Sequence, residues 1–216
     1  YMAGHASFVS QILQMARKET GGPLFREKTI TVTSLGGGPG SELLGLVDYL
    51  ENSDEPVSKV VYWVLEKEPA WEHLTQAVCH WANKKVAVEL HFISLDVSDT
   101  EACSQSFLTG DDLVIMSFFI SEVCETKDGA AVRASLKHLL GTMSNKALLL
   151  YNDSNAYSFY SFFNYRVNSV KGFNQFLEFQ GELNVPSPKF IGTIEEYMEL
   201  TGKCPKISSN ALAKVL

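Results

Sequence analysis

The sequence predicts an α/β fold built on a doubly wound, mostly parallel sheet. From Thr29 onward, apolar runs rich in β-branched residues alternate with stripes of apolar residues at helical spacing. The run VVYWVL, which begins at Val60, is almost unbroken, as expected for a strand covered on both faces. A glycine-rich turn follows the first run, at the place where open α/β sheets bind their ligands. These features predict right-handed crossovers with helices on both faces of the sheet.

An amphipathic helix is expected ahead of the sheet. Residues 6–17 place Phe8, Ile12 and Met15 on one side at helical spacing, and a Gly-Gly-Pro turn at residues 21–23 ends the helix. We expect residues 1–28 to form this helix and a lead-in packed on the domain, and residues 29–216 to form a single domain. Its cofactor half would span about residues 29–153, and its substrate-side and C-terminal segment about residues 154–216.

Strands and helices are then expected in alternation. Strands are predicted at residues 30–35, 59–65, 88–95, 113–120 and 147–151, and helices at residues 43–50, 71–81 and 132–143. Ser41 is expected to cap the first of these helices. In the tail, Thr193 and Glu196 form a capping box for a short helix that Gly202 can close, and residues 206–216 are expected to form a last strand.

Composition limits the partners and the compartment. The 216 residues carry a net charge of −7, and residues 111–216 are nearly neutral, with 10 basic and 11 acidic groups. A broad basic face for nucleic acid is therefore not expected, because such faces need clustered Lys and Arg. No apolar run approaches the roughly 20 residues that cross a bilayer, and no early segment has the pattern of a secretory signal. We expect a soluble intracellular protein, cytoplasmic or nuclear, without a membrane partner.

The cysteines and histidines do not predict a metal site. Cys79, Cys103, Cys124 and Cys204 are too far apart for a zinc knuckle or a redox pair, so reduced thiols are expected. His73 and His80 share a face of one predicted helix, but no further ligand cluster accompanies them. We therefore expect no bound metal.

The glycine-rich turn SLGGGPGSELL has the spacing GxGxG. Gly36, Gly38 and Gly40, with Gly37 among them, let the backbone turn sharply and approach a ligand, although a tight structural turn is the alternative. A dinucleotide fingerprint would place its third glycine three positions after the second, and this chain does not. Glu42 lies at the mouth of the following helix, where a negative charge would repel a pyrophosphate and favour an ammonium or sulfonium group.

Acidic residues follow the second and third predicted strands. Glu66, in LEKEPAW, can accept hydrogen bonds from both ribose hydroxyls of an adenosine. Asp96 and Val97, in SLDVSD, suit an adenine, with the carboxylate on the exocyclic amine and the next residue over the ring. The alternatives are a solvated carboxylate at Glu66 and turn chemistry at Asp96. Glu68 is expected to be a solvated carboxylate and Asp99 a helix cap.

The motifs SLGGGPGSE, LEKE, LDV and DLVIMSFFISEV, in this order over about residues 29–153, resemble the class I methyltransferases that use S-adenosylmethionine. The resemblance implies a Rossmann-like, mostly parallel seven-stranded sheet and S-adenosylmethionine as the cofactor. It also implies that the glycine turn passes under the methionine part, that Glu66 holds the ribose and that Asp96 and Val97 frame the adenine. Residues 117–119 would lie beside the reacting methyl group.

The end of the fourth strand leaves the chemistry open. Many base-nitrogen methyltransferases carry an Asn or Asp and two prolines where this chain has Ser117, Phe118 and Phe119. The two phenylalanines can stack on adenine or on a flat substrate, or pack in the core. Glu122 and Asp153 are candidates to accept a proton, or else cap and surface groups. Methyl transfer from a sulfonium need not use such a group, because alignment supplies much of the acceleration.

The phrases GGGPGSELLGL, LEKEPAW and SFFISEV also resemble, loosely, fungal large-subunit ribosomal RNA methyltransferases that act on a uracil ring nitrogen. That resemblance implies an RNA base as the acceptor. The aromatic segment of residues 155–179, with Tyr157, Tyr160 and Arg166, would be its platform, since bases stack on aromatic side chains. The alternative is that these rings pack against the sheet.

The sequence therefore predicts an S-adenosylmethionine-dependent methyltransferase whose acceptor is an RNA base or a small molecule. The alternative is a non-catalytic module that binds the cofactor or another protein, since no residue that activates an acceptor is evident. A nicotinamide dehydrogenase is disfavoured by Glu42 and by the missing packing glycine. The oligomeric state stays open.

Overall fold

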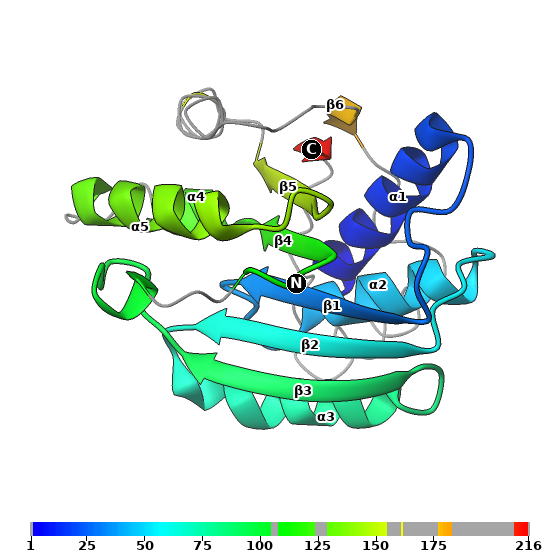
Figure 1. The fold of residues 1–216 in the computed structure, drawn as a ribbon, viewed down its shortest axis with the longest axis horizontal. Helices are drawn as coiled ribbons and strands as arrows, with labels where there is room; N and C mark the ends of the chain where they lie inside the picture. The colour runs from blue at the N-terminus through cyan, green and yellow to red at the C-terminus, as the bar shows by residue number, and fades with distance from the viewer. Residues whose placement is uncertain are drawn as a thin grey trace, which may run out of the picture.

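The sheet has seven strands in the computed structural model, which describes residues 2–104, 108–123, 129–154, 161, 177–182 and 210–215. The strands are β1 (Thr29–Leu35), β2 (Lys59–Glu66), β3 (Ala87–Ser94), β4 (Leu113–Ser117), β5 (Leu148–Ser154), β6 (Leu177–Glu182) and β7 (Asn210–Val215). Their order is β3-β2-β1-β4-β5-β7-β6, running from the bottom to the top of Figure 1. The strands from β3 to β5 are parallel, and β7 is antiparallel to both of its neighbours. The predicted mostly parallel α/β sheet is confirmed.

Helices pack on both faces of this sheet. They are α1 (Met2–Thr20), α2 (Ser41–Glu51), α3 (Glu72–Ala82), α4 (Phe119–Val123) and α5 (Gly129–Thr142), with short 3-10 turns η1 (Pro69–Trp71) and η2 (Ala102–Ser104). One apolar core joins α1, α2 and α3 to the sheet, and a second core joins α4 and α5 to it. The doubly wound arrangement expected from the sequence is therefore present.

Strand β4 shows how one short segment serves both cores. All five of its residues are buried. Leu113 and Ile115 belong to the core under α1, whereas Val114 and Met116 belong to the core under α5. Because side chains alternate between the two faces of a strand, a central parallel strand must be apolar at every position. This explains the unbroken apolar runs in the sequence.

Helix α1 packs closely on α2 at Gly45. A Cβ atom built on Gly45 would lie 2.4 Å from the carbonyl oxygen of Ala6 and 2.8 Å from the Cβ of Val9. These distances leave no room for any side chain at this position. Phe8 and Ile12, on the same helix, are buried in the core, as the apolar spacing predicts. The expected entry helix is therefore present and packs on the sheet domain, while the division of the chain into domains stays a prediction.

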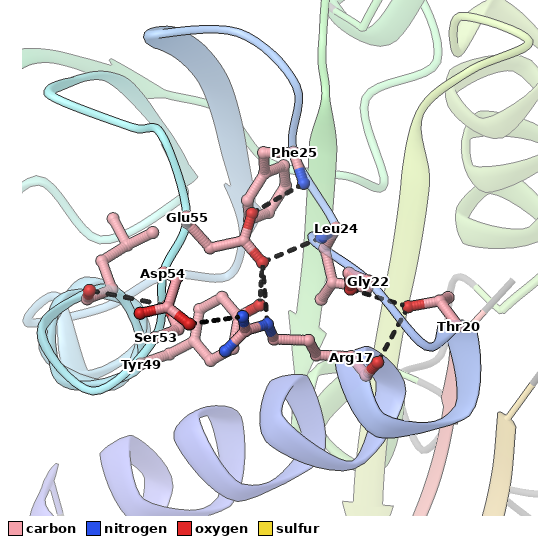
Figure 2. Close-up of polar contacts among 10 residues, drawn as sticks. Arg17, Thr20, Gly22, Leu24, Phe25, Tyr49, Ser53, Asp54 and Glu55 are labelled. Atoms are coloured by element: carbon pink, nitrogen blue, oxygen red, sulfur yellow. Dashed lines mark hydrogen bonds and ion pairs between the residues drawn. The ribbon is translucent and has the colours of Figure 1, made fainter.

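Glu55, in the loop before β2, connects α1, the lead-in to β1 and α2 (Figure 2). Its side chain has no exposed surface. Its carboxylate accepts the backbone N–H groups of Leu24 at 2.8 Å and Phe25 at 3.0 Å. The Tyr49 hydroxyl also donates to it, and Arg17 Nε lies 3.9 Å from Oε1. We call these five residues the Glu55 cluster; it fixes α1 at the amino edge of the sheet.

The fourth strand ends earlier than the sequence suggests. β4 ends at Ser117, Phe118 has a φ of 55°, and α4 begins at Phe119. The predicted strand over residues 113–120 is therefore wrong in its last three positions. The apolar run gives no sign of this end, because Phe118, Phe119 and Ile120 are buried in the turn and helix as well.

Of the two helix caps predicted from the sequence, the one at Asp99 is present and the one at Ser41 is not. Ser41 is not the cap of α2, because Gly40, at φ 88°, occupies that position and no side chain caps the helix. The cap predicted at Asp99 is confirmed, since its Oδ1 accepts two backbone N–H groups at the start of η2. Glu68 is exposed, as expected, and accepts a backbone N–H group within η1.

The tail is described only in part. β7 lies within the predicted last strand, whereas β6 was not predicted at a definite position. The expected helix after Thr193, closed by Gly202, lies outside the described residues, as do Cys124 and Cys204. Cys79 and Cys103 are buried free thiols.

The described residues contain neither a candidate membrane span nor a metal cluster. No helix among them is both long enough and apolar enough to cross a membrane. The same residues contain no group of three or more His, Cys, Asp or Glu side chains that could hold a metal ion.

Candidate functional site

The glycine turn forms a backbone cradle between β1 and α2. Gly36, Gly38 and Gly40 have φ values of 66°, 45° and 88°, which residues with a Cβ rarely adopt. The Gly36 N–H donates to the Leu65 carbonyl at 2.8 Å, and the Thr75 hydroxyl donates to the Gly38 carbonyl at 2.8 Å. The turn is therefore fixed from β2 on one side and from α3 on the other.

Gly36 and Gly38, both in this cradle, differ in the space around them. A Cβ built on Gly36 would lie 2.5 Å from Phe119 Cδ2, whereas a Cβ on Gly38 would meet only the Gly36 carbonyl oxygen, at 4.0 Å. Gly37 packs on Ser34 and Val64 from the other side of the turn. Gly38 thus leaves open space above the turn, where a ligand can approach the backbone.

Glu66, the last residue of β2, is joined to the glycine turn. Its Oε2 accepts the Gly38 N–H at 3.1 Å, and its Oε1 accepts the Glu68 N–H at 3.0 Å. Each carboxylate oxygen can accept a further hydrogen bond. Glu66 therefore both fixes the turn and offers acceptor capacity beside it.

A pocket opens at the carboxyl ends of β1, β2 and β3. The space inside it, counted together with the open solvent at its mouth, is about 800 Å³. Its lining residues come from the strand ends and from α4 and α5: Leu35, Gly36, Leu65, Glu66, Lys67, Leu95, Asp96, Val97, Ser98, Phe119, Glu122, Val123, Val132 and Leu139. Apolar walls with a few carboxylates suit a flat ring joined to a polar sugar.

Asp96 and Val97 lie together in this pocket. Asp96 is exposed, and its Oδ1 accepts both the backbone N–H and the hydroxyl of Ser98 at 2.8 Å. These two bonds hold the pKa of Asp96 below its usual value. Oδ1 of Asp96 thus stabilises the turn, which is the alternative role expected for this residue. Val97 packs against the second core. Both residues still line the pocket, as their expected roles require.

Glu42 is buried in the first turn of α2. Only 2% of its surface is exposed, and Oε2 has no hydrogen-bond partner. Burial raises the pKa of this carboxyl to about 8, with smaller contributions from Glu66 and Glu122. Desolvation thus opposes the negative charge expected at this helix N-terminus, and the charge of Glu42 stays a prediction.

The three residues after the fourth strand do not act as one group. Phe119 lines the pocket and covers Gly36. Phe118 turns to the other face of the sheet, where its ring stacks on His5 with centroids 4.2 Å apart. Ser117 is buried and is not among the lining residues. Of the three residues expected beside the reacting methyl, Phe119 is thus the one among the lining residues, and the cofactor roles of Ser117 and Phe118 stay predictions.

A polar pair that the sequence reasoning missed lies at the ends of β4 and β5. Ser117 and Asn152 are register partners, so their side chains point to the same face. Asn152 has no exposed surface, and neither its amide oxygen nor its amide nitrogen has a hydrogen-bond partner; the Ser117 hydroxyl also lacks one. The position of Asn152, at the carboxyl end of a strand, was the available signal.

The two candidate proton acceptors have different surroundings. Asp153 is fully buried, and its Oδ2 accepts the Ser121 N–H at 2.9 Å near the start of α4. Glu122 lines the pocket, and burial, followed by the charges of Glu66 and Asp153, raises its pKa. Glu122 is thus the candidate that faces a ligand. Tyr157, Tyr160 and Arg166, the expected substrate contacts, lie outside the described residues.

Comparison with solved structures shows the fold of the class I S-adenosylmethionine-dependent methyltransferases. A Listeria monocytogenes protein assigned to this class matches with a TM-score of 0.56 and 12% identity, over 97% of this chain and 58% of that chain. A precorrin 8W decarboxylase of Methanobacterium thermoautotrophicum matches with a TM-score of 0.50 and 10% identity, over 95% of this chain and 88% of the other. This chain spans 58% or less of several matched structures. No protein-family model and no curated protein matches the sequence.

Proposed function

We propose that the protein binds S-adenosylmethionine in the pocket at the carboxyl ends of β1, β2 and β3 and transfers its methyl group to an acceptor. The observation that carries this proposal is the joined arrangement of the open glycine turn, the Glu66 carboxylate bonded to it and the apolar pocket beyond. The position of this pocket supports the proposal, because open α/β sheets bind ligands at the carboxyl ends of their strands. The resemblance of the motifs to class I methyltransferases supports the same assignment.

The residues present fit this cofactor part by part. Open space above Gly38 admits the methionine part close to the backbone. Glu66 has acceptor capacity for the ribose hydroxyls. Among the apolar residues that line the pocket, Val97 and Phe119 suit an adenine ring. Both bonds from Ser98 to Asp96 use Oδ1, so Oδ2 can accept a hydrogen bond from an exocyclic amine.

When bound, the cofactor supplies a methyl group that is already activated by its sulfonium. The task of this chain is then to hold the donor and the acceptor in line, which can supply much of the acceleration. Glu122 lines the pocket, and its raised pKa suits a group that accepts a proton from the acceptor. Asp153 acts instead on α4, through the Ser121 N–H.

Two classes of acceptor stay within this proposal: an RNA base and a small molecule. The acidic balance of the chain favours the small molecule, and the looser motif resemblance favours RNA. A cofactor-binding module without catalysis is the second candidate, favoured by the use of Asp153 as a structural hydrogen-bond acceptor.

The test is incubation of the protein with S-adenosylmethionine labelled in the methyl group and with cell RNA, protein and metabolites as separate fractions. We expect label to enter one fraction and Glu66→Ala to abolish the transfer. Glu68→Ala, which changes an exposed carboxylate two residues away, is the matched control and should transfer normally. Cofactor binding without transfer to any fraction would favour the non-catalytic module. Absence of cofactor binding would exclude both candidates.

A further inference from the structure

Of the carboxylates that line the pocket, Glu122 is the one that the chain itself does not bind. Glu66 accepts a backbone N–H group at each oxygen, and Asp96 accepts two hydrogen bonds from Ser98 at Oδ1. Within the described part of the chain, no hydrogen bond or ion pair engages the Glu122 carboxylate. Glu122 is exposed and lies in the first turn of α4, so a ligand in the pocket can reach it.

An aromatic ring lies on the same side of α4 as this carboxylate. Phe119 is the first residue of the helix and Glu122 follows three positions later, a spacing that brings two side chains together on a helix surface. Both residues line the pocket. A Cβ built on Gly36 would lie 2.5 Å from Phe119 Cδ2, so the ring lies against the start of the glycine turn. The ring and the carboxylate therefore border the part of the pocket beside this turn.

The lining of the pocket carries more negative than positive groups. Its charged side chains are the carboxylates of Glu66, Asp96 and Glu122 and the ammonium group of Lys67. No ion pair among the described residues includes Lys67, so its charge is not bound to one of these carboxylates. Such a lining attracts a small cation and repels an anionic ligand such as the phosphate backbone of RNA.

A free carboxylate beside an aromatic ring suits a protonated amine. The ammonium group forms charge-assisted hydrogen bonds with the carboxylate, and the face of the ring attracts its positive charge. An amine bound in this form must lose a proton before its nitrogen can accept a methyl group. Glu122 is placed to take this proton, and burial and the charges of Glu66 and Asp153 raise its pKa, which favours the transfer; Lys67 acts in the opposite direction.

We propose that the methyl acceptor is a small molecule with a primary or secondary amine, which binds as an ammonium group between the Glu122 carboxylate and the Phe119 ring. This inference rests on the proposed function and names its substrate class. Glu122 takes one proton from the ammonium group. The nitrogen lone pair then forms the bond to the methyl carbon, while the bond from that carbon to the sulfonium sulfur breaks and its electron pair stays on the sulfur. The methylated nitrogen keeps a positive charge, and Glu122 passes its proton to solvent.

The test is methyl transfer from labelled S-adenosylmethionine to the small molecules of a cell extract, separated beforehand on a cation-exchange resin at neutral pH. We expect label to enter the retained, cationic pool, and acetylation of that pool with acetic anhydride, which blocks primary and secondary amines, to abolish the labelling. Label in the unretained pool or in RNA, or equal labelling after acetylation, would overturn the inference and leave the proposed function intact. Cofactor binding without transfer to any pool would also overturn it. Absence of cofactor binding would remove the proposed function itself.

Glu122→Gln keeps the shape of the side chain and removes its charge. We expect transfer to the cationic pool to fall at least about tenfold, while the affinity for S-adenosylmethionine in titration calorimetry changes less than about twofold. Glu72→Gln is the matched control, because Glu72 is also an exposed carboxylate in the first turn of a helix but does not line the pocket. It should behave as wild type. An equal loss of cofactor affinity and of transfer in Glu122→Gln would overturn the inference, because the carboxylate would then bind the cofactor.

The pH dependence of transfer distinguishes a proton acceptor from a structural group. Without the Glu122 carboxylate, only acceptor molecules that are already neutral can react, and an amine such as that of lysine loses its proton near pH 10. We therefore expect transfer by Glu122→Gln to rise by up to about tenfold per pH unit above neutral pH, and transfer by the wild type to change much less. Parallel pH profiles of the two proteins would overturn the inference.

Discussion

Glu55 and Glu42 are both buried glutamates, and they lie at opposite edges of the same sheet. At the amino edge, Glu55 accepts two backbone N–H groups and the Tyr49 hydroxyl and lies beside Arg17 (Figure 2). At the carboxyl edge, Glu42 keeps an unpartnered Oε2, and burial raises its pKa to about 8. The first carboxylate has every partner it needs from the chain itself. The second keeps one oxygen that no group of the described residues pairs with.

The same contrast extends to neighbouring polar groups. At the carboxyl edge, Ser117 and Asn152 are also buried without side-chain partners. Buried polar groups are nearly always paired, and those that are not commonly have a role or an ordered water. We infer that the amino edge of the sheet is organised for stability, through the Glu55 cluster and the contact of α1 with α2. Under the proposed function, the carboxyl edge gives up part of this stability to ligand binding.

The largest expected effect is at the Glu55 cluster. Glu55→Ala leaves two partly buried backbone N–H groups and the Tyr49 hydroxyl without an acceptor. Each such loss costs roughly 1–3 kcal/mol, so we expect the free energy of unfolding to fall by about 3–5 kcal/mol. Urea unfolding measures this change. Asp54→Ala, at the exposed neighbouring carboxylate, should cost little. A loss below about 1 kcal/mol for Glu55→Ala would show that the cluster does not fix α1.

The next effect concerns the contact between α1 and α2. Gly45→Ala places a Cβ 2.4 Å from the Ala6 carbonyl oxygen, so the two helices must separate. Overpacking of this kind typically costs about 1–3 kcal/mol, and we expect the upper part of this range because the contact is with backbone. Gly141→Ala, in α5, meets nothing within 4 Å and serves as the control. Equal stability of the two variants in thermal unfolding would contradict the close packing at Gly45.

The third effect is the pH dependence of stability at Glu42. Its pKa is about 8 in the folded chain and about 4.5 when unfolded, so the folded state binds the proton more tightly. The stability it contributes is complete below pH 4.5 and is lost as the pH rises through 8. Between pH 6 and pH 8 we expect the wild type to lose about 2 kcal/mol relative to Glu42→Gln.

Urea unfolding of the two proteins across this range measures the difference. Asp111, whose pKa burial raises to about 7, titrates in both proteins and cancels in the comparison. Parallel stability curves for wild type and Glu42→Gln would show that the Glu42 carboxyl is already ionised in the folded chain at neutral pH.

The smallest effect on stability is expected at Asn152. Asn152→Leu replaces an unpaired amide with an apolar group that branches in the same way. Removing a buried polar group that has no partner costs little. We therefore expect the free energy of unfolding to change by no more than about 1 kcal/mol, in either direction. If Ser117 and Asn152 serve the ligand site, the rate of methyl transfer should fall in Asn152→Leu although its free energy of unfolding changes little. A loss above about 3 kcal/mol would show that an ordered water or another group already pairs with the amide.

Most of the fold could be predicted from the sequence. The parallel strands follow from unbroken apolar runs, because a strand covered on both faces has no polar side. The end of β4 could not be found in this way, since Phe118 and Phe119 remain buried after the chain leaves the strand. The position of β6 was also missed. Local periodicity marks which residues are buried, and burial continues through turns that the pattern does not show.

The backbone conformation of the site could be predicted from the sequence better than the surroundings of its charged side chains. The spacing of Gly36, Gly38 and Gly40 corresponds to three positive φ values, and Glu66 lies beside them. The burial of Glu42 does not follow from its place at a helix start. One signal was available: Glu42 shares a helix face with Leu46 and Tyr49, four and seven positions on, and both are buried. The unpaired state of Asn152 depends on neighbours far apart in sequence.

The most direct test of the cofactor assignment is the affinity for S-adenosylmethionine of three proteins: wild type, Glu66→Ala and Glu68→Ala, with folding checked by circular dichroism. Titration calorimetry should show one site in the wild type. Glu66→Ala removes an acceptor that lines the pocket, and it should weaken binding at least tenfold, whereas the exposed Glu68 should matter less than twofold. No binding by the wild type, or equal affinity in the folded Glu66→Ala variant, would contradict the assignment of this pocket to S-adenosylmethionine.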